Sequence, residues 1–418
     1  MTNRYRFWIG TACAVSLCMV LAGCMDPAYS PRPAAAQESP SIAKPLTAGA
    51  TSISPYNPAT ASAADAVSMA GQKVVKVGLL LPLSGRNAEL GRALQDAATV
   101  SLFDKYARLS IRQQTVRVEL LPKDTGDTPE QASNAMKEAI DEGAAFIIGP
   151  LFADATSAAA TIAREKNISV LSLSNNRAPA PTGVYMFGFS PQEQAERIVN
   201  YALSNGKTRI AVLVPNSPLG ETVLASARTA LQRTGLKPIV EAKYAAQGAG
   251  LDAALNTLVP QGQAPNFDAL LLPEGGPALE TLMRGLSIRG VKPTTVQFLG
   301  TGIWDDTALL RRVNLDGAWF ASSSPVSTSQ FEQRFTSTYN YAPPRIASLS
   351  YDAVALAVTL ATSGRPFDTV TLTNAAGYAG PANGIFRLRA GGTVQRGLAV
   401  MKVDAGNLTI ISPSPTGF

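Results

Sequence analysis

The stretch Val74–Gly91, with the sequence VVKVGLLLPLSGRNAELG, decides the fold. Its first residues, up to Leu81, are mostly Val and Leu without a strong period, and a Pro-containing turn and a helix start follow at once. This pattern predicts a strand that is buried on both faces of a parallel sheet. Such a strand needs crossover helices and neighbouring strands, and the loop at its carboxyl end is where open α/β sheets bind ligands.

The first half of the predicted domain, starting with this stretch, repeats a unit of one strand followed by one helix. Strands are expected over residues 74–81, 115–121, 145–148 and 169–173, and helices over residues 87–106, 129–142 and 153–166. Such units in succession predict a doubly wound α/β sheet, since each helix carries the chain back to start the next parallel strand.

The same pattern begins again after a strand expected near residues 187–190. A helix that starts near Pro191 and continues over residues 192–205 precedes a strand over 209–215. The Pro, Ser and Gly after that strand lead into a second helix, as in the opening stretch. Strands at 269–272 and 296–299 flank a further helix at 277–289. We interpret this echo as two similar lobes rather than one large sheet.

The rest of the chain is expected to complete these lobes. A strand over 317–320, a linker over 322–329 and helices over 330–341 and 346–362 are expected first. From Gly384 the alternation in GIFRLRAGGTVQRGLAVMKV, around a Gly-Gly turn, predicts antiparallel strands.

Residues 1–24 differ from the rest of the chain and have the features of a signal segment. Two arginines precede an apolar run that is short for a membrane span, and Leu-Ala-Gly-Cys follows, ending at Cys24. This resembles a bacterial lipoprotein signal, in which Cys24 carries the lipid; the alternative is an ordinary secretory signal or an uncleaved anchor. Because the other cysteines, Cys13 and Cys18, lie inside the signal, no thiol is left for a disulfide, metal or nucleophile.

Residues 25–71 have the composition of a tether. They are rich in Pro, Ala, Ser and Thr, and their few large apolar residues show no period, so we expect a disordered segment. Met25 after the cysteine, by similarity to sorting rules, favours the outer membrane facing the periplasm. Only 16% of all residues are charged and the net charge of +6 is scattered, which argues against nucleic acid as a partner.

The composition also argues against catalysis. The chain has no histidine, which excludes Ser-His-Asp and Cys-His nucleophilic machinery and His-ligated metal. The adjacent pair Asp305-Asp306 is interpreted as a helix cap, because neighbouring helical residues do not share a face. A Ser-Lys or two-carboxylate enzyme is the alternative left open, but no paired acidic motif in a strand-end loop indicates one. We therefore expect no enzyme activity, no catalytic residue, no metal and no cofactor.

Candidate cleft residues lie at the predicted strand ends. They are Ser84, Gly85, Arg86, Thr156, Asn175 and Asn216. The alternative for each is a turn or cap residue. Tyr185, Trp304 and Trp319 are either cleft-lining or core aromatics, and Lys123-Asp124 is interpreted as a solvated turn.

Five motifs resemble type I periplasmic binding proteins of the leucine/isoleucine/valine-binding group. They are VGLLLPLSG, IIGPL at 147–151, FSPQEQAERI at 189–198, VLVPNSPLGE at 212–221 and YDAVALA at 351–357. The resemblance implies two doubly wound parallel-sheet α/β lobes with a hinge of three strands and a central cleft. It places residues 73–190 and 322–368 in lobe 1, and residues 191–321 and 369–412 in lobe 2.

The resemblance also implies where a ligand would bind, and the sequence departs from it there. Ala153 stands where amino-acid binders have a carboxylate-binding serine, and Asn175 and Asn176 stand where a small residue and a threonine are expected. Thr301 lies in the loop where an ammonium-binding glutamate is expected, and Glu274, in a neighbouring loop, would substitute for it. These departures argue against a free amino acid as the ligand.

Two segments resemble a narrower group, the C-terminal domain of the outer-membrane lipoproteins that activate penicillin-binding proteins. They are FSPQEQA and GIFRLRAGGTVQRGLAVMKV. The resemblance implies a non-catalytic, lipid-anchored regulator of peptidoglycan synthesis, with a penicillin-binding protein as its partner. The alternative is a substrate-binding lipoprotein of an ABC importer, with a permease as its partner and an amino acid or another small polar solute in the cleft.

Overall fold

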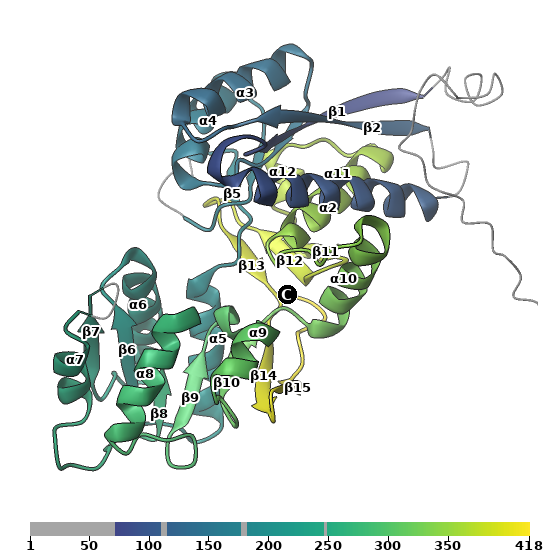
Figure 1. Cartoon of the computed structure of the whole chain (residues 1–418). Coiled ribbons are helices and arrows are strands. Elements are labelled where there is room, and N and C mark those ends of the chain that lie inside the picture. Colours follow the sequence, from purple (N-terminus) through teal and green to yellow (C-terminus); the bar gives the residue numbers. More distant parts are fainter. Residues whose placement is uncertain (1–71, 110–114, 177–181, 246–248) are drawn as a thin grey trace, which may run out of the picture. The chain divides into compact units, whose positions relative to one another are not determined.

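The computed structural model describes residues 72–109, 115–176, 182–245 and 249–418. The expected signal 1–24, the lipidation site Cys24 and the tether 25–71 lie outside these ranges. The described residues form three sheets with helices packed on them (Figure 1).

The first sheet has β1 (Lys73–Leu81) between two parallel neighbours, which confirms the predicted strand. The strand order is β2-β1-β3-β4-β5, with all pairs parallel. Only the second half of β1, Val77–Leu81, is fully buried. The other strands are β2 (Val116–Asp124), β3 (Phe146–Ile148), β4 (Val170–Ser172) and β5 (Val184–Met186).

Four helices pack on this sheet or on one another to complete the first lobe. They are α2 (Ala88–Ala107), α3 (Pro129–Asp141), α4 (Ala153–Glu165) and α11 (Ala347–Thr362). Thr128 and Gln131 form a capping box at the start of α3, which fixes where that helix begins. Helix α11 is almost wholly buried against α2, where Ser101 Oγ donates to the carbonyl of Tyr351 at 2.6 Å.

The second sheet repeats the strand order of the first and then extends it. Its order is β15-β14-β10-β9-β8-β6-β7, so that β7-β6-β8-β9-β10 is the counterpart of β2-β1-β3-β4-β5. This shared strand order confirms the prediction that the two halves form similar lobes. The strands are β6 (Ile210–Pro215), β7 (Glu241–Tyr244), β8 (Ala269–Leu271), β9 (Gln297–Gly300), β10 (Trp319–Ser322), β14 (Ala399–Asp404) and β15 (Asn407–Ser412).

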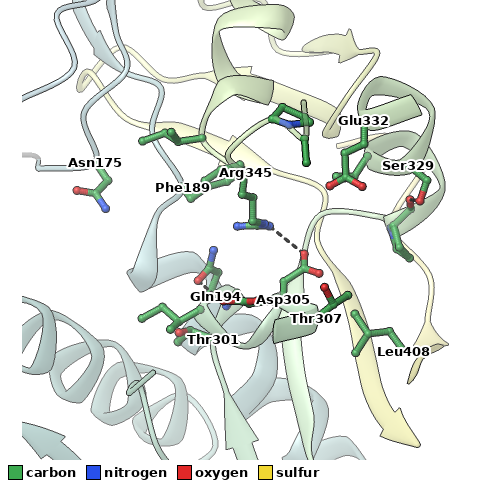
Figure 2. Close-up of a pocket in the computed structure, with 18 of the residues that line it drawn as sticks. Asn175, Phe189, Gln194, Thr301, Asp305, Thr307, Ser329, Glu332, Arg345 and Leu408 are labelled. Carbon is green, nitrogen blue, oxygen red and sulfur yellow. Dashed lines mark hydrogen bonds and ion pairs between the residues drawn. The ribbon is translucent and has the colours of Figure 1, made fainter. Parts of the chain in front are cut away.

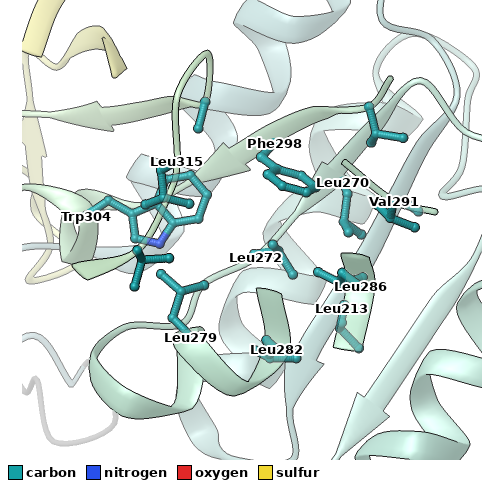
Figure 3. Close-up of a cluster of buried hydrophobic side chains, with 14 of the residues drawn as sticks. Leu213, Leu270, Leu272, Leu279, Leu282, Leu286, Val291, Phe298, Trp304 and Leu315 are labelled. Carbon is teal, nitrogen blue, oxygen red and sulfur yellow. The ribbon is translucent and has the colours of Figure 1, made fainter. Parts of the chain in front are cut away.

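Helices on both sides of the second sheet enclose its core. The apolar cluster in Figure 3 joins sheet residues such as Leu270 and Phe298 to Trp304 and to Leu279 and Leu286 of helix α8 (Gly276–Ile288). The helices are α5 (Pro191–Ser204), α6 (Pro218–Gln232), α7 (Leu251–Leu258), α8 (Gly276–Ile288) and α9 (Thr307–Arg312). Strand β7 and helix α7 were not among the elements expected from the sequence.

The third sheet is a small antiparallel one, β11-β12-β13, and it packs with the first lobe. Its Phe386 lies edge-on to Phe187 and belongs to the same apolar cluster as β1. The strands are β11 (Tyr378–Gly380), β12 (Gly384–Leu388) and β13 (Val394–Arg396), and the short helix α12 (Thr369–Leu372) precedes them. This placement differs from the expected assignment of residues 369–412 to the second lobe, where only β14 and β15 lie.

Two further local expectations are corrected. Strand β5 ends at Met186, so residues 187–190 are not a strand but a crossing segment between the lobes. The residues expected to be a linker, 322–329, include the first turn of α10 (Pro325–Tyr339), because Pro325 occupies the first turn, where its missing N–H costs no hydrogen bond. The chain crosses between lobes at residues 187–190, 323–324 and 397–398, in line with the expected three-part hinge.

Candidate functional site

A pocket of about 1230 Å³ lies where the two lobes meet at these crossings (Figure 2). The first lobe contributes Asn175, helix α10 and the segment before α11, the crossing segment contributes Phe189, and α5 of the second lobe contributes Gln194. The second lobe contributes the loop after β9, which contains the short 3-10 helix η5 (Gly302–Trp304), and Leu408 of β15. The pocket therefore has walls from both lobes, as the resemblance implied.

An ion pair joins the two walls across the pocket. Arg345, just before α11, pairs with Asp305 of the second lobe at 3.2 Å, the contact drawn as a dashed line in Figure 2. Ser322, at the end of β10, donates to Asp305 at 2.6 Å and accepts from Arg345 Nη2 at 2.6 Å. The Arg345 and Asp305 side chains are only 25% and 19% exposed, so water screens this pair less than a surface pair.

The Arg345 guanidinium also stacks on an aromatic ring. Its central carbon lies 4.2 Å from the ring centre of Phe189, a favourable cation–π geometry. Burial lowers the pKa of Arg345, and the neighbouring Asp305 opposes that change. Burial, together with the charge of Asp305, raises the pKa of Glu332 on the α10 wall, while Arg345 lowers it.

Gly302 lies at the floor of the pocket and forms a hydrogen bond with the side-chain amide of Gln194. Gln194 Oε1, on the first turn of α5, accepts from the backbone N–H of Gly302 at 2.9 Å. A Cβ placed on Gly302 would lie 3.0 Å from Gln194 Nε2 and 3.4 Å from Arg345 Nη1. The absence of a side chain at residue 302 thus lets the side chains of Gln194 and Arg345 lie close to the Gly302 backbone.

Of the ten residues expected to bind a ligand, two line this pocket, Asn175 and Thr301. Asn175 stands apart from the central ion pair in Figure 2. Thr301 is fully buried, and its hydroxyl has no hydrogen-bond partner in the part of the chain that the structure describes.

The structure places the other expected residues elsewhere. Ser84, Gly85 and Arg86 are exposed, and Arg86 lines a smaller hollow of about 430 Å³ beside Asp127 on the first lobe. Asp124 holds this loop, since its Oδ1 accepts from the backbone N–H groups of Leu83, Ser84 and Gly126. Asp124 is therefore an anchor of the loop rather than merely a solvated turn.

The remaining expected residues also lie outside the lining of the pocket. Ala153 opens α4, and the Thr156 hydroxyl is buried, lying 2.8 Å from Ser172 Oγ and 2.9 Å from the carbonyl of Phe152. Glu274 accepts from the hydroxyl of Tyr244. Asn176 and Asn216 are not among the lining residues.

The three candidate aromatics pack in the cores, as their alternative interpretation held. Trp304 and Tyr185 are buried, and Trp304 Nε1 donates to the carbonyl of Glu274 at 2.8 Å. Trp319 packs edge-on against Tyr201. The pair Asp305-Asp306 divides its roles: Asp306 caps α9, as predicted, and Asp305 forms the ion pair in the pocket.

Three residues that sequence reasoning missed form the centre of the site. Gln194 lies inside the FSPQEQAERI motif, which was a signal, but a glutamine that opens a helix is unremarkable without its contact to Gly302. Arg345 follows a Pro-Pro pair and Asp305 adjoins a cap residue, so neither stands out in the sequence. Among the described residues, no group of acidic, cysteine or histidine side chains is suited to hold a metal ion.

A family model described as periplasmic binding protein matches residues 74–407. The chain belongs to the periplasmic binding protein family. Membership confirms the binding-protein fold of two α/β lobes and implies a location in the cell envelope or periplasm. Within the described ranges, no helix is long and apolar enough to cross a bilayer.

Solved structures of this family share the fold. A Rhodospirillum rubrum protein matches with a TM-score of 0.71 and 20% identity, covering 81% of this chain and all of that one. The branched-chain amino acid transporter substrate binding protein LivJ of Streptococcus pneumoniae, in complex with isoleucine, matches with a TM-score of 0.59 and 18% identity, covering 82% of this chain and all of that one. At these identities the likeness concerns the fold alone.

Sequence relatives cover less of the chain. An uncharacterized protein of Rickettsia prowazekii is 26% identical over 152 residues, which is 36% of this chain and 38% of that protein. The penicillin-binding protein activator LpoA of Photobacterium profundum is 27% identical over 180 residues, which is 41% of this chain and 27% of that protein. The match thus spans well under half the length of these curated relatives.

Proposed function

We propose that this periplasmic binding protein is a non-catalytic lipoprotein, anchored through Cys24 in the outer membrane, that regulates peptidoglycan synthesis by contact with a penicillin-binding protein. The partial similarity to activator LpoA supports this partner class. The expected tether supports it as well, since a flexible segment lets an anchored domain reach a partner at the opposite membrane.

The observation that carries the proposal is the ion pair in the pocket. Arg345 and Asp305 already satisfy each other across the cleft, whereas the residues expected to bind a free amino acid, such as Ala153 and Glu274, lie outside the pocket lining. An amino-acid carrier needs charged groups that are free to receive a carboxylate and an ammonium. A cleft whose charges are paired internally suits a protein that acts through its surface.

A binding experiment with purified proteins tests this function. The soluble form, residues 25–418, is expected to retain a penicillin-binding protein in a pull-down and to raise the rate of glycan polymerisation or cross-linking by that synthase. The matched control is a type I periplasmic binding protein of a known importer. Absence of both retention and stimulation across the synthases of the source bacterium would contradict the proposal.

A second candidate function is solute delivery to an ABC importer. The volume of the pocket, about 1230 Å³, and the fold shared with the isoleucine-bound LivJ favour it. A ligand that binds only the folded state raises the melting temperature. A large shift with one free amino acid, together with no synthase retention, would establish this candidate over the first.

A further inference from the structure

The last strand of the second sheet leaves one backbone edge open. Strand β15 ends the strand order of this sheet, next to β14 (Figure 1). Apart from the pairing with β14, the described residues form no hydrogen bond to the N–H or C=O groups of residues 408–411. The outer edge of β15 is therefore available to a further strand.

The pairing of β14 shows which backbone groups of β15 point outward. The N–H of Val403 in β14 donates to the carbonyl of Ala318 at 3.0 Å, and its carbonyl accepts from the N–H of Gly317 at 2.9 Å. Both backbone groups of Val403 thus point away from β15, so its partner Leu408 belongs to a non-hydrogen-bonded pair. The N–H and C=O groups of Leu408 and, two residues on, of Ile410 therefore face the open edge.

Strand β15 differs from the edge strands β2 and β7 in that it carries no charge. Strand β2 contains Arg117, Glu119 and Lys123, and β7, with the sequence EAKY, contains an acid and a base. Charges on an edge strand oppose pairing with another chain. The sequence of β15 is NLTIIS, and its Ile410 is 37% exposed. This edge lacks the protection that the other two have.

The open groups of β15 are complementary to a second copy of the same strand. Leu408 and Ile410 lie symmetrically about Thr409, so two antiparallel copies related by a two-fold axis at Thr409 place Leu408 of each opposite Ile410 of the other. The N–H and C=O groups of these residues then exchange four hydrogen bonds, and the exposed Ile410 side chain is covered by Leu408 of the second copy.

We propose that this protein forms a symmetric homodimer through β15, in which the second sheets of two copies become continuous. The proposal goes beyond the proposed function, because the partner is a second copy of this chain and not a synthase. A single pair of strands is a small contact beside the roughly 1,200–2,000 Å² buried in stable interfaces, so we expect a weak dimer.

Sedimentation equilibrium over a range of concentrations tests the dimer. The soluble form, residues 25–418, is expected to shift from the mass of the monomer toward that of the dimer as its concentration rises. A protein that keeps the mass of the monomer up to about 1 mM would overturn the proposal.

Charges at Thr409 locate the interface. Thr409 is exposed, and in the proposed dimer it faces its own counterpart, where like charges directly opposite each other are destabilising. Thr409→Lys and Thr409→Glu are each expected to dimerise at least tenfold more weakly than the native protein. A mixture of the two variants is expected to regain at least the native affinity as a heterodimer, a result that misfolded variants would not give.

Thr257→Lys is the matched control, since Thr257 is an exposed threonine of α7 in the same lobe, and it should dimerise like the native protein. Native dimerisation in Thr409→Lys would overturn the proposal, because the contact would then lie elsewhere.

A synthase pull-down with Thr409→Lys keeps this outcome separate from that of the proposed function. Weaker dimerisation with unchanged retention of the synthase would support the homodimer through β15. A native protein that is monomeric, together with loss of synthase retention in Thr409→Lys, would assign the open edge to the synthase and overturn the homodimer.

Discussion

At the scale of single residues, the protein holds several buried polar groups around its hinge. Arg396, at the end of β13, is almost wholly buried, donates from Nη2 to the carbonyl of Phe187 and stacks on that ring. Burial lowers the pKa of Arg396 to about 10, and Asp352 and Glu193 oppose that change. Charges buried in this way hold the crossing segments in place, but each of them is costly without its partners.

Glu193 makes the stability of the hinge depend on pH. Burial raises its pKa to about 7, although Arg396 and Arg389 lower it and Glu196 adds to the rise. An acid whose pKa is raised on folding stabilises the folded state below the unfolded pKa of 4.5, and this stability is lost as the pH rises through 7. Glu193→Gln is therefore expected to raise the melting temperature at pH 8 by a few degrees and to change it little at pH 4.5.

Melting curves across this pH range check the prediction. Glu196→Gln, one turn along the same helix, is the control and should leave most of the pH dependence in place, because the charge of Glu196 is the smallest contribution to the raised pKa of Glu193. Burial also raises the pKa of Asp352 to about 6, so the variant is expected to remove only part of the dependence. If the melting temperatures of Glu193→Gln and the native protein differ by the same amount at every pH from 4.5 to 8, Glu193 is not the source of the pH dependence.

The unpaired hydroxyl of Thr301 gives a second prediction at this scale. Thr301→Val keeps the shape of the side chain and removes the buried polar atom, so the free energy of unfolding without ligand is expected to rise by about 1 kcal/mol. Urea denaturation measures this change. Ser323→Ala, which removes another buried and unpaired hydroxyl in the same hinge region, is the parallel case. A loss of stability in Thr301→Val would show that an ordered water satisfies the hydroxyl.

At the scale of elements, caps fix several helix starts that periodicity alone leaves open. Thr128, Ser190, Ser217, Asp306 and Asp368 each accept a hydrogen bond from a backbone N–H in the first turn of a helix. Such bonds satisfy donors that have no partner within the helix. In α10, where the cap Ser324 makes no such bond, the sequence indicated a start at residue 330, five residues late.

Asp306 permits a clean test of capping next to the pocket. Its carboxylate accepts from the N–H groups of Ala308 and Leu309, at 2.7 and 3.2 Å. Asp306→Ala is expected to lower the free energy of unfolding by about 1 kcal/mol, whereas Asp306→Asn should retain most of the stability because Asn caps equally well. Chemical denaturation of both variants decides the matter. Equal losses in the two would indicate that charge, rather than capping, is responsible.

At the scale of the whole molecule, the last described residues add a fourth link between the lobes. Residues 413–418 leave β15 in the second sheet, and Phe418 ends under the guanidinium of Arg387 in β12, 4.8 Å from the ring centre. On the way, Pro415 packs by the crossing residue Gly397. This strap runs beside the third crossing, so it should restrict motion at the hinge, where type I lobes open and close.

Removal of residues 413–418 is expected to broaden the distribution of distances between the lobes without unfolding either one. Spin labels on Lys137→Cys and Lys237→Cys, both exposed and one on each lobe, report that distribution by pulsed electron resonance. The soluble form that starts at residue 72 suits this measurement, since all native cysteines precede it. Phe418→Ala should have a weaker effect in the same direction. An unchanged distance distribution in the truncated form would show that residues 413–418 do not restrict motion at the hinge.

The sequence by itself determined the two-lobed α/β fold, since apolar strands, breakers and helix starts are local patterns that recur in both halves. It did not determine the site. The pocket is centred on Gln194, Asp305 and Arg345, which come from separate segments and meet only because the hinge brings the lobes together. The same holds for residues 384–396: their alternation predicted antiparallel strands, but which lobe buries Phe386 depends on packing between distant residues, which no local pattern records.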